Sequence, residues 1–372
     1  MRYLRPYFAT LIGALAIVAA VNALVDPFDV TGAPRLRGFN DLKSPGNERF
    51  YKPLQLSARQ PHTVFLGSSR VMMALDPAAS PDLDAYNFAI SAATMTEEAA
   101  FARHAMQAAP ANLLLMGLDF VSFNDAIEPS TASRIDDLGR HLILRSIPQL
   151  LISEQALVRS RGTILESRRR DEDVHRPNGF VIYPDKAMIH PERELRVEVS
   201  RYLASNRKIA AFDRSLAELD RLFADAAARG VRVVAFIPPS HAIVMETLWV
   251  DDATAAYEHW LRALTEICAA RQVPLWDFSG FNALTTMALS DSYGTFFDGS
   301  HTRPWVGQRM LDAMIGGHVD PGFGDRLTVG GIDAHIAELR DGHAAWRNAH
   351  AADWDDLAPS LGLGADSAAT PD

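Results

Sequence analysis

The stretch Thr63-Val64-Phe65-Leu66-Gly67-Ser68-Ser69-Arg70 decides how the fold of this 372-residue chain is read. Its first four residues are apolar or β-branched, which is typical of a buried strand, and the glycine and serines after them are typical of a tight turn. The pattern therefore places a serine directly after a core strand. By itself such a serine is more often a turn or helix-capping residue than a nucleophile.

Strand-like and helix-like segments alternate along the rest of the chain. After the first strand, the predicted segments are a strand at 86–90, a helix at 96–109, a strand at 113–116, a helix at 209–229, a strand at 231–237, a helix at 253–270 and a strand at 273–278. This alternation predicts an α/β fold with a mostly parallel central sheet and helices on both faces. Ligands are expected beyond the carboxyl ends of the strands.

The N-terminus contains an apolar run from Phe8 to Val25, preceded by Arg2 and Arg5. The run can just cross a bilayer, and the positive charge before it predicts a cytoplasmic N-terminus. We therefore expect residues 1–27 to be a single-pass anchor in the inner membrane, with the folded domain in the periplasm. A cleaved signal is the alternative, because residues 21–23 are spaced like a signal-peptidase site. A buried core helix is a third reading, which the position at the chain end disfavours.

Changes in composition divide the remaining chain. Residues 28–60 are rich in Pro, Gly and charge, which is typical of a stalk. One α/β domain is expected over residues 61–320, with an insertion at about 120–206, where the alternation breaks, lying over the site. Residues 321–361 are predicted to be a helical extension, and the small, polar residues 362–372 to be disordered.

The net charge, the single cysteine and the positions of the histidines argue against a nucleic-acid binder, an intramolecular disulfide and a metal site. The net charge of −10 and the pI near 5.6 argue against a general nucleic-acid binder, which needs a clustered basic face. Cys268 is the only cysteine, so no intramolecular disulfide can form, and we interpret it as a packing residue. His62, His175 and His190 show no metal-ligand spacing with Cys, Asp or Glu, and we predict neither a metal nor a cofactor.

Two further motifs accompany the serine: Gly117-Leu118-Asp119 after a predicted strand, and Asp298-Gly299-Ser300-His301 before a helix predicted from Pro304 to Ile315. A serine hydroxyl is a poor nucleophile until a base accepts its proton, and an imidazole has a suitable pKa for that role. A carboxylate on the far ring nitrogen fixes the tautomer and stabilises the imidazolium. We therefore predict that Ser69 is the nucleophile, His301 the base and Asp298 its partner.

This order of motifs resembles the SGNH/GDSL hydrolase superfamily over roughly residues 63–317. The Gly-Ser-Ser motif and the membrane segment look more like its envelope branches, such as the D-alanine transfer protein of teichoic acids and the alginate O-acetylation proteins, than like secreted lipases. The resemblance implies a three-layer α/β domain and a serine-dependent O-acyltransferase or esterase. It also implies a substrate, a cell-envelope or exported polysaccharide or another acylated carbohydrate, and a candidate partner, an acyl-donor membrane protein. Whether water or a sugar hydroxyl accepts the acyl group stays open.

The chain departs from the family at the oxyanion donors. In SGNH enzymes these are the amide of the serine, a glycine amide and an asparagine side chain. Here Ala92 aligns with the glycine and Asp119 with the asparagine, and an ionised carboxylate cannot donate a hydrogen bond. Asp119 could be protonated, could pair with Arg70, or could leave the donor role to Asn87 or Asn124.

Two residues and one function keep alternative readings. Arg70 could bind a substrate carboxylate or hold Asp119. His241 follows the strand that ends at Pro238-Pro239, and could line the substrate cleft or be an ordinary loop histidine. The departures at Ala92 and Asp119 also favour a second function, that of a catalytically weak or inactive relative that binds glycan or assembles a polysaccharide-export complex.

Overall fold

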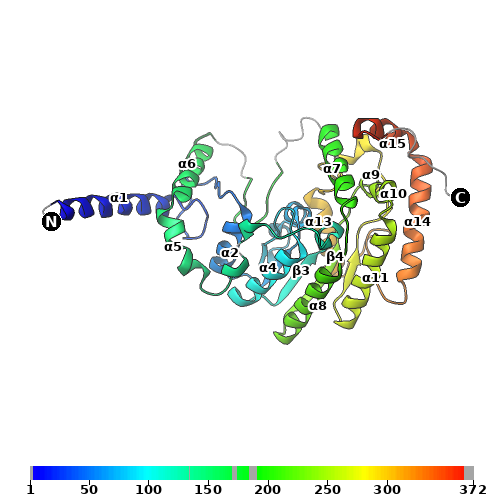
Figure 1. Cartoon of the computed structure of the whole chain (residues 1–372), viewed down its shortest axis with the longest axis horizontal. Helices are drawn as coiled ribbons and strands as arrows, with labels where there is room; N and C mark the ends of the chain where they lie inside the picture. Colours follow the sequence, from blue (N-terminus) through cyan, green and yellow to red (C-terminus); the bar gives the residue numbers. More distant parts are fainter. Residues whose placement is uncertain (1–2, 134, 170–173, 184–190, 364–372) are drawn as a thin grey trace.

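The structure is a computed structural model that describes residues 3–133, 135–169, 174–183 and 191–363 (Figure 1). A six-stranded sheet has the order β2-β1-β3-β4-β5-β6, with all neighbouring pairs parallel except β5 and β6. The strands are β1 (Thr63–Leu66), β2 (Ala85–Asn87), β3 (Leu113–Gly117), β4 (Arg232–Ile237), β5 (Leu275–Asp277) and β6 (Asp325–Arg326). The prediction of an α/β chain with a mostly parallel sheet is confirmed.

The central strands bury both of their faces, which explains why they read as continuous apolar runs. Val64 and Leu114 belong to one hydrophobic core, and their neighbours Phe65 and Leu115 belong to another. The first core also takes residues from α4 (Met95–Ala108), α8 (Asp213–Ala228) and α11 (Thr254–Ala270). The second takes residues from α3 (Ser69–Ala74) and α13 (Pro304–Leu311), which a single π turn at Asp312–Gly316 extends.

Several boundaries differ from the expected ones because local hydrogen bonds set them. Helix α4 begins at Met95 because Thr94 and Glu97 form a reciprocal capping box, in which each side chain accepts the other's backbone N–H. Strand β2 ends at Asn87, although Ile90 still donates its N–H to Gly67 O. Helix α8 begins at Asp213, four residues after the predicted start.

The predicted stalk contains a helix that belongs to the folded body. Helix α2 (Glu48–Arg59) is capped by the Asn47 side chain, which accepts the Arg49 N–H. Lys52 is fully buried, and its ammonium group donates to Asn87 O at 3.0 Å and Ala89 O at 2.7 Å. The expectation of irregular structure throughout 28–60 is therefore corrected. At least one charged residue of this stretch, Lys52, is buried in the folded domain and is not part of a solvent-exposed stalk.

Helix α1 (Leu4–Val25) extends away from the rest of the chain (Figure 1). It is the one helix among the described residues that is long and apolar enough to cross a membrane, by length and composition. Its last turns contact α5 (Leu142–Ile152) and α6 (Glu154–Arg169). These two helices and α7 (Pro191–Asn206) are the main elements of the predicted insertion, and the described residues between β3 and β4 form no strand of the sheet.

The C-terminal part of the chain adds to the domain. Residues 321–361 contain the predicted helices, α14 (Ile332–Ala349) and α15 (Ala351–Leu357), and also the edge strand β6. The sheet therefore extends past the expected boundary at residue 320. Short helices α9 (Ala242–Met245), α10 (Thr247–Val250) and α12 (Leu289–Ser292) complete the fold. The predicted disordered tail lies outside the described residues from position 364 onward.

Candidate active site

The structure brings together Ser69, His301 and Asp298, which come from opposite ends of the domain sequence. Ser69 is the first residue of α3, directly after β1, and the other two lie in the loop before α13. Ser69 Oγ is 2.7 Å from His301 Nε2, and His301 Nδ1 is 2.8 Å from Asp298 Oδ2. Ser69 is half-buried, whereas His301 and Asp298 are buried.

The loop from Asp298 to His301 holds its own carboxylate in place. Asp298 Oδ1 accepts the backbone N–H groups of Ser300 at 3.1 Å and His301 at 3.0 Å. Gly299 has a φ of 96°, and a Cβ there would come within 2.8 Å of a Leu195 methyl group. Only glycine fits this turn without strain, and the turn aims the carboxylate at the imidazole of the same loop.

The charges of this pair support one another. Burial alone would raise the pKa of Asp298, but the hydrogen bonds and charge of His301 outweigh it and hold that pKa below its usual value. Burial alone would lower the pKa of His301, but Asp298 and then Glu198 outweigh it, so the pKa is raised. The arrangement favours an imidazole that takes up a proton readily.

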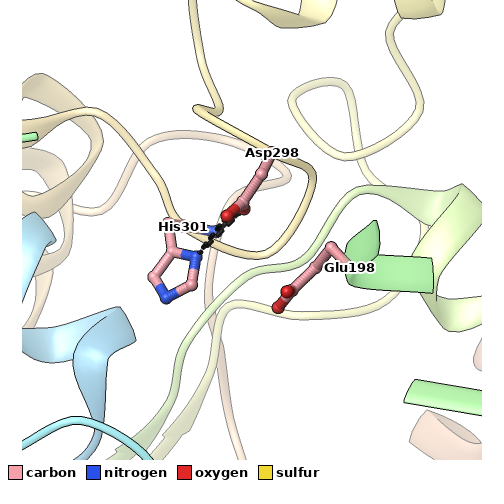
Figure 2. A group of neighbouring side chains, drawn as sticks. All are labelled: Glu198, Asp298 and His301. Atoms are coloured by element: carbon pink, nitrogen blue, oxygen red, sulfur yellow. Dashed lines mark hydrogen bonds and ion pairs between the residues drawn. The ribbon is translucent and has the colours of Figure 1, made fainter. Parts of the chain in front are cut away.

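Glu198, which the sequence analysis missed, approaches the pair from α7. It is buried, its Oε1 accepts a hydrogen bond from Ser300 Oγ, and its Oε2 accepts one from Arg201 Nη1 at 2.6 Å. Figure 2 shows Glu198 on the side of the imidazole away from Nε2. No motif marks this residue, because a glutamate in a charged helical stretch reads as a solvated side chain.

Glu198, Asp298 and His301 also have the donor types of a metal site, since their ligand atoms lie within 4.8 Å of one another. The ring nitrogen that faces the carboxylates is Nδ1, which is hydrogen-bonded to Asp298 (Figure 2). A cation bound between these three groups would replace that hydrogen bond. These side chains can therefore either bind a metal ion or form the Ser69–His301–Asp298 hydrogen-bonded arrangement, but not both at once.

Asp119, directly after β3, is held by two donors. Its carboxylate accepts hydrogen bonds from the Arg70 guanidinium and the Ser68 hydroxyl. The other N–H groups of Arg70 donate to three protein oxygens: Ser300 O, Pro238 O and Ser240 Oγ. Burial alone would lower the pKa of Arg70, but the charge and hydrogen bond of Asp119 keep it raised. Of the alternatives left open, the structure has Arg70 holding Asp119.

The backbone amides of Ser69 and Ala92 are the candidate oxyanion donors among the residues that line the pocket. The Ser69 N–H is in the first turn of α3, where an amide has no acceptor within the helix. Ala92 has a φ of 47°, the left-handed conformation that glycine adopts most readily. Both residues line the same pocket, and within the described part of the chain neither amide has a hydrogen-bond acceptor.

The predicted asparagine donors lie elsewhere. The Asn87 amide group donates to three carbonyl oxygens around α3: Val71 O, Met72 O and Leu75 O. The Asn124 side chain donates to Lys208 O and accepts the N–H groups of Ala126 and Ala210. Both side chains are engaged by backbone groups, so neither is placed as an oxyanion donor.

His241 does not line this pocket, in contrast to the substrate-cleft reading. Its Nδ1 accepts the Ile243 N–H at 3.1 Å, which caps α9, and its Nε2 lies 2.8 Å from Met287 O. Burial lowers its pKa to about 4, so the ring stays neutral. The position after a strand is correct, but the ring points into the protein, and the alternative of a structural loop histidine describes it better.

A pocket of about 200 Å³ opens beside Ser69 and His301. One wall is α7, which contributes Glu198, Arg201, Tyr202 and Ser205. The expectation that the insertion lies over the site holds for α7, whereas α5 and α6 lie against α1. The lining combines hydroxyl, guanidinium and carboxylate groups with apolar side chains such as Val121 and Ile127.

A serine, an imidazole and a carboxylate in this hydrogen-bonded order, beside free backbone amides, have the parts that acyl transfer requires. The groups are also accessible, because the serine faces an open pocket rather than the core. No protein-family model, no curated protein and no solved structure matches this chain.

Proposed function

We propose that this chain is a serine-dependent O-acyltransferase or esterase that acts on cell-envelope or exported polysaccharide. One observation carries the proposal: Ser69 Oγ lies 2.7 Å from His301 Nε2, whose other ring nitrogen is bound by Asp298. The order of these residues along the parallel sheet supports a three-layer SGNH-like domain. The apolar helix α1 supports a periplasmic domain anchored to the inner membrane.

In the first half-reaction, Ser69 Oγ attacks the carbonyl carbon of the acyl donor while its proton moves to His301 Nε2. Asp298 stabilises the imidazolium, and the amides of Ser69 and Ala92 donate to the developing oxyanion. The imidazolium then protonates the leaving oxygen, and the acyl group remains on Ser69 as an ester.

In the second half-reaction, Nε2 takes a proton from water or from a sugar hydroxyl as that oxygen attacks the acyl-serine. Collapse of the second tetrahedral intermediate returns the proton to Ser69 Oγ. Water gives hydrolysis and a sugar hydroxyl gives transfer. The serine, tyrosine and arginine groups of the α7 wall are suited to hold a carbohydrate acceptor.

The second candidate function is a glycan-binding or assembly protein with little or no turnover. Asp119 favours it, because that carboxylate is held by Arg70 and Ser68 and offers no donor to an oxyanion. Loss of one oxyanion donor typically lowers turnover by about 10²- to 10³-fold, which is slow but still catalytic. The two functions therefore differ in whether Ser69 is activated at all.

A fluorophosphonate probe on the full-length chain in detergent tests this point. We expect mass spectrometry to find the adduct on Ser69 and to find none in Ser69→Ala or His301→Ala, because both remove the activated nucleophile. Ser290→Ala, which removes an exposed serine, should label like the wild type.

Labelling should also persist in the presence of EDTA, because the proposed reaction uses no cation. No adduct at Ser69, under conditions in which a known serine esterase reacts, would reject the enzyme and favour the binding protein. Labelling that EDTA abolishes would favour the metal reading of Glu198, Asp298 and His301.

A further inference from the structure

Helices α5 and α6, which are joined at Ser153, lie against the C-terminal end of α1, and we call residues 142–169 the hairpin (Figure 1). The Asn22 side chain of α1 connects all three helices, since its Nδ2 donates to Leu151 O at 2.8 Å and its Oδ1 accepts from Ser160 Oγ at 2.7 Å. Asn22 is buried although it interrupts an apolar run. The end of the membrane-type helix is thus packed into the folded domain.

The outer face of this hairpin is apolar and exposed. In α5, Leu142, Ser146 and Leu150 are buried, whereas Leu144 and Ile147, on the opposite side of the helix, are exposed at 66% and 43%. Near the start of α6, Leu157 and Val158 are also exposed, at 44% and 57%. Exposed aliphatic side chains on both helices, beside the apolar helix α1, indicate contact with an apolar phase.

The hairpin is basic, in contrast to the whole chain. Residues 142–169 contain four exposed arginines against one exposed carboxylate, Glu154; the arginines are Arg145, Arg161, Arg168 and Arg169. The complete chain has a net charge of −10. Arginine beside exposed aliphatic residues is the composition of elements that lie in an anionic membrane surface.

The length of α1 places the hairpin at the membrane. Only Leu4–Ile17 is exposed throughout, and fourteen residues that rise about 1.5 Å each give about 21 Å. The hydrocarbon core of a bilayer is about 30 Å thick. The last turns of α1, which α5 and α6 cover, are therefore needed to complete a crossing.

From these observations we infer that the outer face of the hairpin is embedded in the headgroup layer of an anionic bilayer, on the side that carries the folded domain. Leu144, Ile147, Leu157 and Val158 enter the acyl boundary, and the arginines contact lipid phosphates. Asn22 can lie at this depth because Leu151 and Ser160 satisfy its amide group. The inference rests on α1 crossing the bilayer and is independent of the reaction at Ser69.

Depth-dependent quenching in protein-free lipid vesicles tests the inference on the full-length chain. Leu144→Cys and Val158→Cys, each labelled with an environment-sensitive dye, are reconstituted into phosphatidylcholine–phosphatidylglycerol vesicles. Val329→Cys is the matched control, because Val329 is also exposed and lies just before α14, at the opposite end of the molecule from α1 (Figure 1). Cys268 does not compete for the dye, since it is buried and burial raises its thiol pKa to about 12.

We expect lipids that carry a spin label near the headgroup to remove most of the dye fluorescence at positions 144 and 158, and aqueous iodide to quench only position 329. Replacing phosphatidylglycerol with phosphatidylcholine should reduce the lipid quenching. Iodide quenching at 144 and 158 equal to that at 329 would overturn the inference and favour a protein partner for this face. Equal lipid quenching in neutral vesicles would overturn the anionic requirement. Neither outcome depends on whether Ser69 reacts.

Discussion

Glu198 adds a negative charge to the site from a helix that holds none of the three predicted catalytic residues. Its carboxylate and that of Asp298 both raise the pKa of His301 against the effect of burial. The general base works only as neutral imidazole, so the reaction rate should rise with pH through a pKa above 6.5 and fall as the ring is protonated in acid. The acid limb of the pH profile therefore reports this environment.

Replacing Glu198 with Gln tests the effect of that charge. Glu198→Gln keeps an acceptor for Ser300 Oγ but removes the charge, so the acid limb of the Ser69 labelling profile should move to lower pH. Glu192→Gln, on the exposed first turn of the same helix, should leave the profile unchanged. A limb that stays in place or moves to higher pH in Glu198→Gln would contradict this account.

The Arg70–Asp119 pair is buried, and breaking it should be costly. Asp119→Asn leaves the guanidinium without its counter-charge, and we expect a loss of about 3 kcal/mol in the free energy of unfolding. Activity should not rise, although the asparagine amide could donate a hydrogen bond where the carboxylate cannot. Urea denaturation of the full chain in detergent measures the loss.

Two comparisons measure the interaction energy between Arg70 and Asp119. The losses of Asp119→Asn and Arg70→Met should sum to clearly more than the loss of the double variant, because the two side chains interact directly. Asp220→Asn, in an exposed pair with Arg271, should change stability little. Additive losses at positions 70 and 119 would show that the two side chains are energetically independent.

Residue types and chain order identified Ser69, Asp298 and His301, because nucleophile, base and orienting carboxylate each require a particular side chain. The structure brings those three together. Residue types could not decide between the roles of Arg70, since both roles use the same guanidinium. They gave no sign of Glu198, and they placed His241 near a strand end without specifying the direction of its ring.

At the scale of elements, α14 is joined to the sheet by a titratable contact. His335 Nε2 lies 2.9 Å from Asp277 Oδ2 of β5. Burial alone would lower the pKa of His335, but Asp277 outweighs it and the pKa is raised. A histidine whose pKa is higher in the folded state than in the unfolded state stabilises the fold when it is protonated. This stabilisation is complete below the unfolded-state pKa of about 6.5 and is lost as pH rises through the folded-state pKa. Helix α14 should therefore be held less firmly in alkaline solution.

Hydrogen exchange measures this loosening directly. After correction for intrinsic rates, the protection of α14 amides should fall as pH rises above neutrality, while α4 on the same core stays protected. His335→Gln should remove the dependence on pH. Protection of α14 that rises with pH, or that falls equally in the variant, would contradict the assigned role of His335.

Elements with continuous apolar sequences were predicted best. Strands β1, β3 and β4 lie within a residue of their expected positions because both of their faces are buried. Helix α2 was missed because Pro53 and several charged residues suggest a loop, yet Pro53 is inside the helix and Lys52 is buried in it. Internal partners such as Asn87 O and Ala89 O are distant in sequence, and no local pattern reveals them.

For the whole molecule, the main question at the N-terminus is whether α1 remains attached. Cleavage after Ala23 would remove Asn22, which binds the end of α5 and Ser160, and would need access to a bond that is helical and packed. We therefore predict an uncleaved anchor. The membrane fraction of cells that express the chain should contain the intact mass. A soluble species that begins at residue 24 would establish the signal sequence instead.

The division of the pocket between two parts of the chain has an evolutionary consequence. The reacting groups come from α3 and the loop before α13, whereas the facing wall comes from α7, in a segment where the strand–helix alternation is interrupted. Under the proposed function, sequence changes in α7 would alter which acceptor is recognised while the chemistry at Ser69 stays the same. Replacing α7 with the corresponding helix of a diverged paralogue should therefore transfer the acceptor preference of that paralogue, provided that Glu198 is retained.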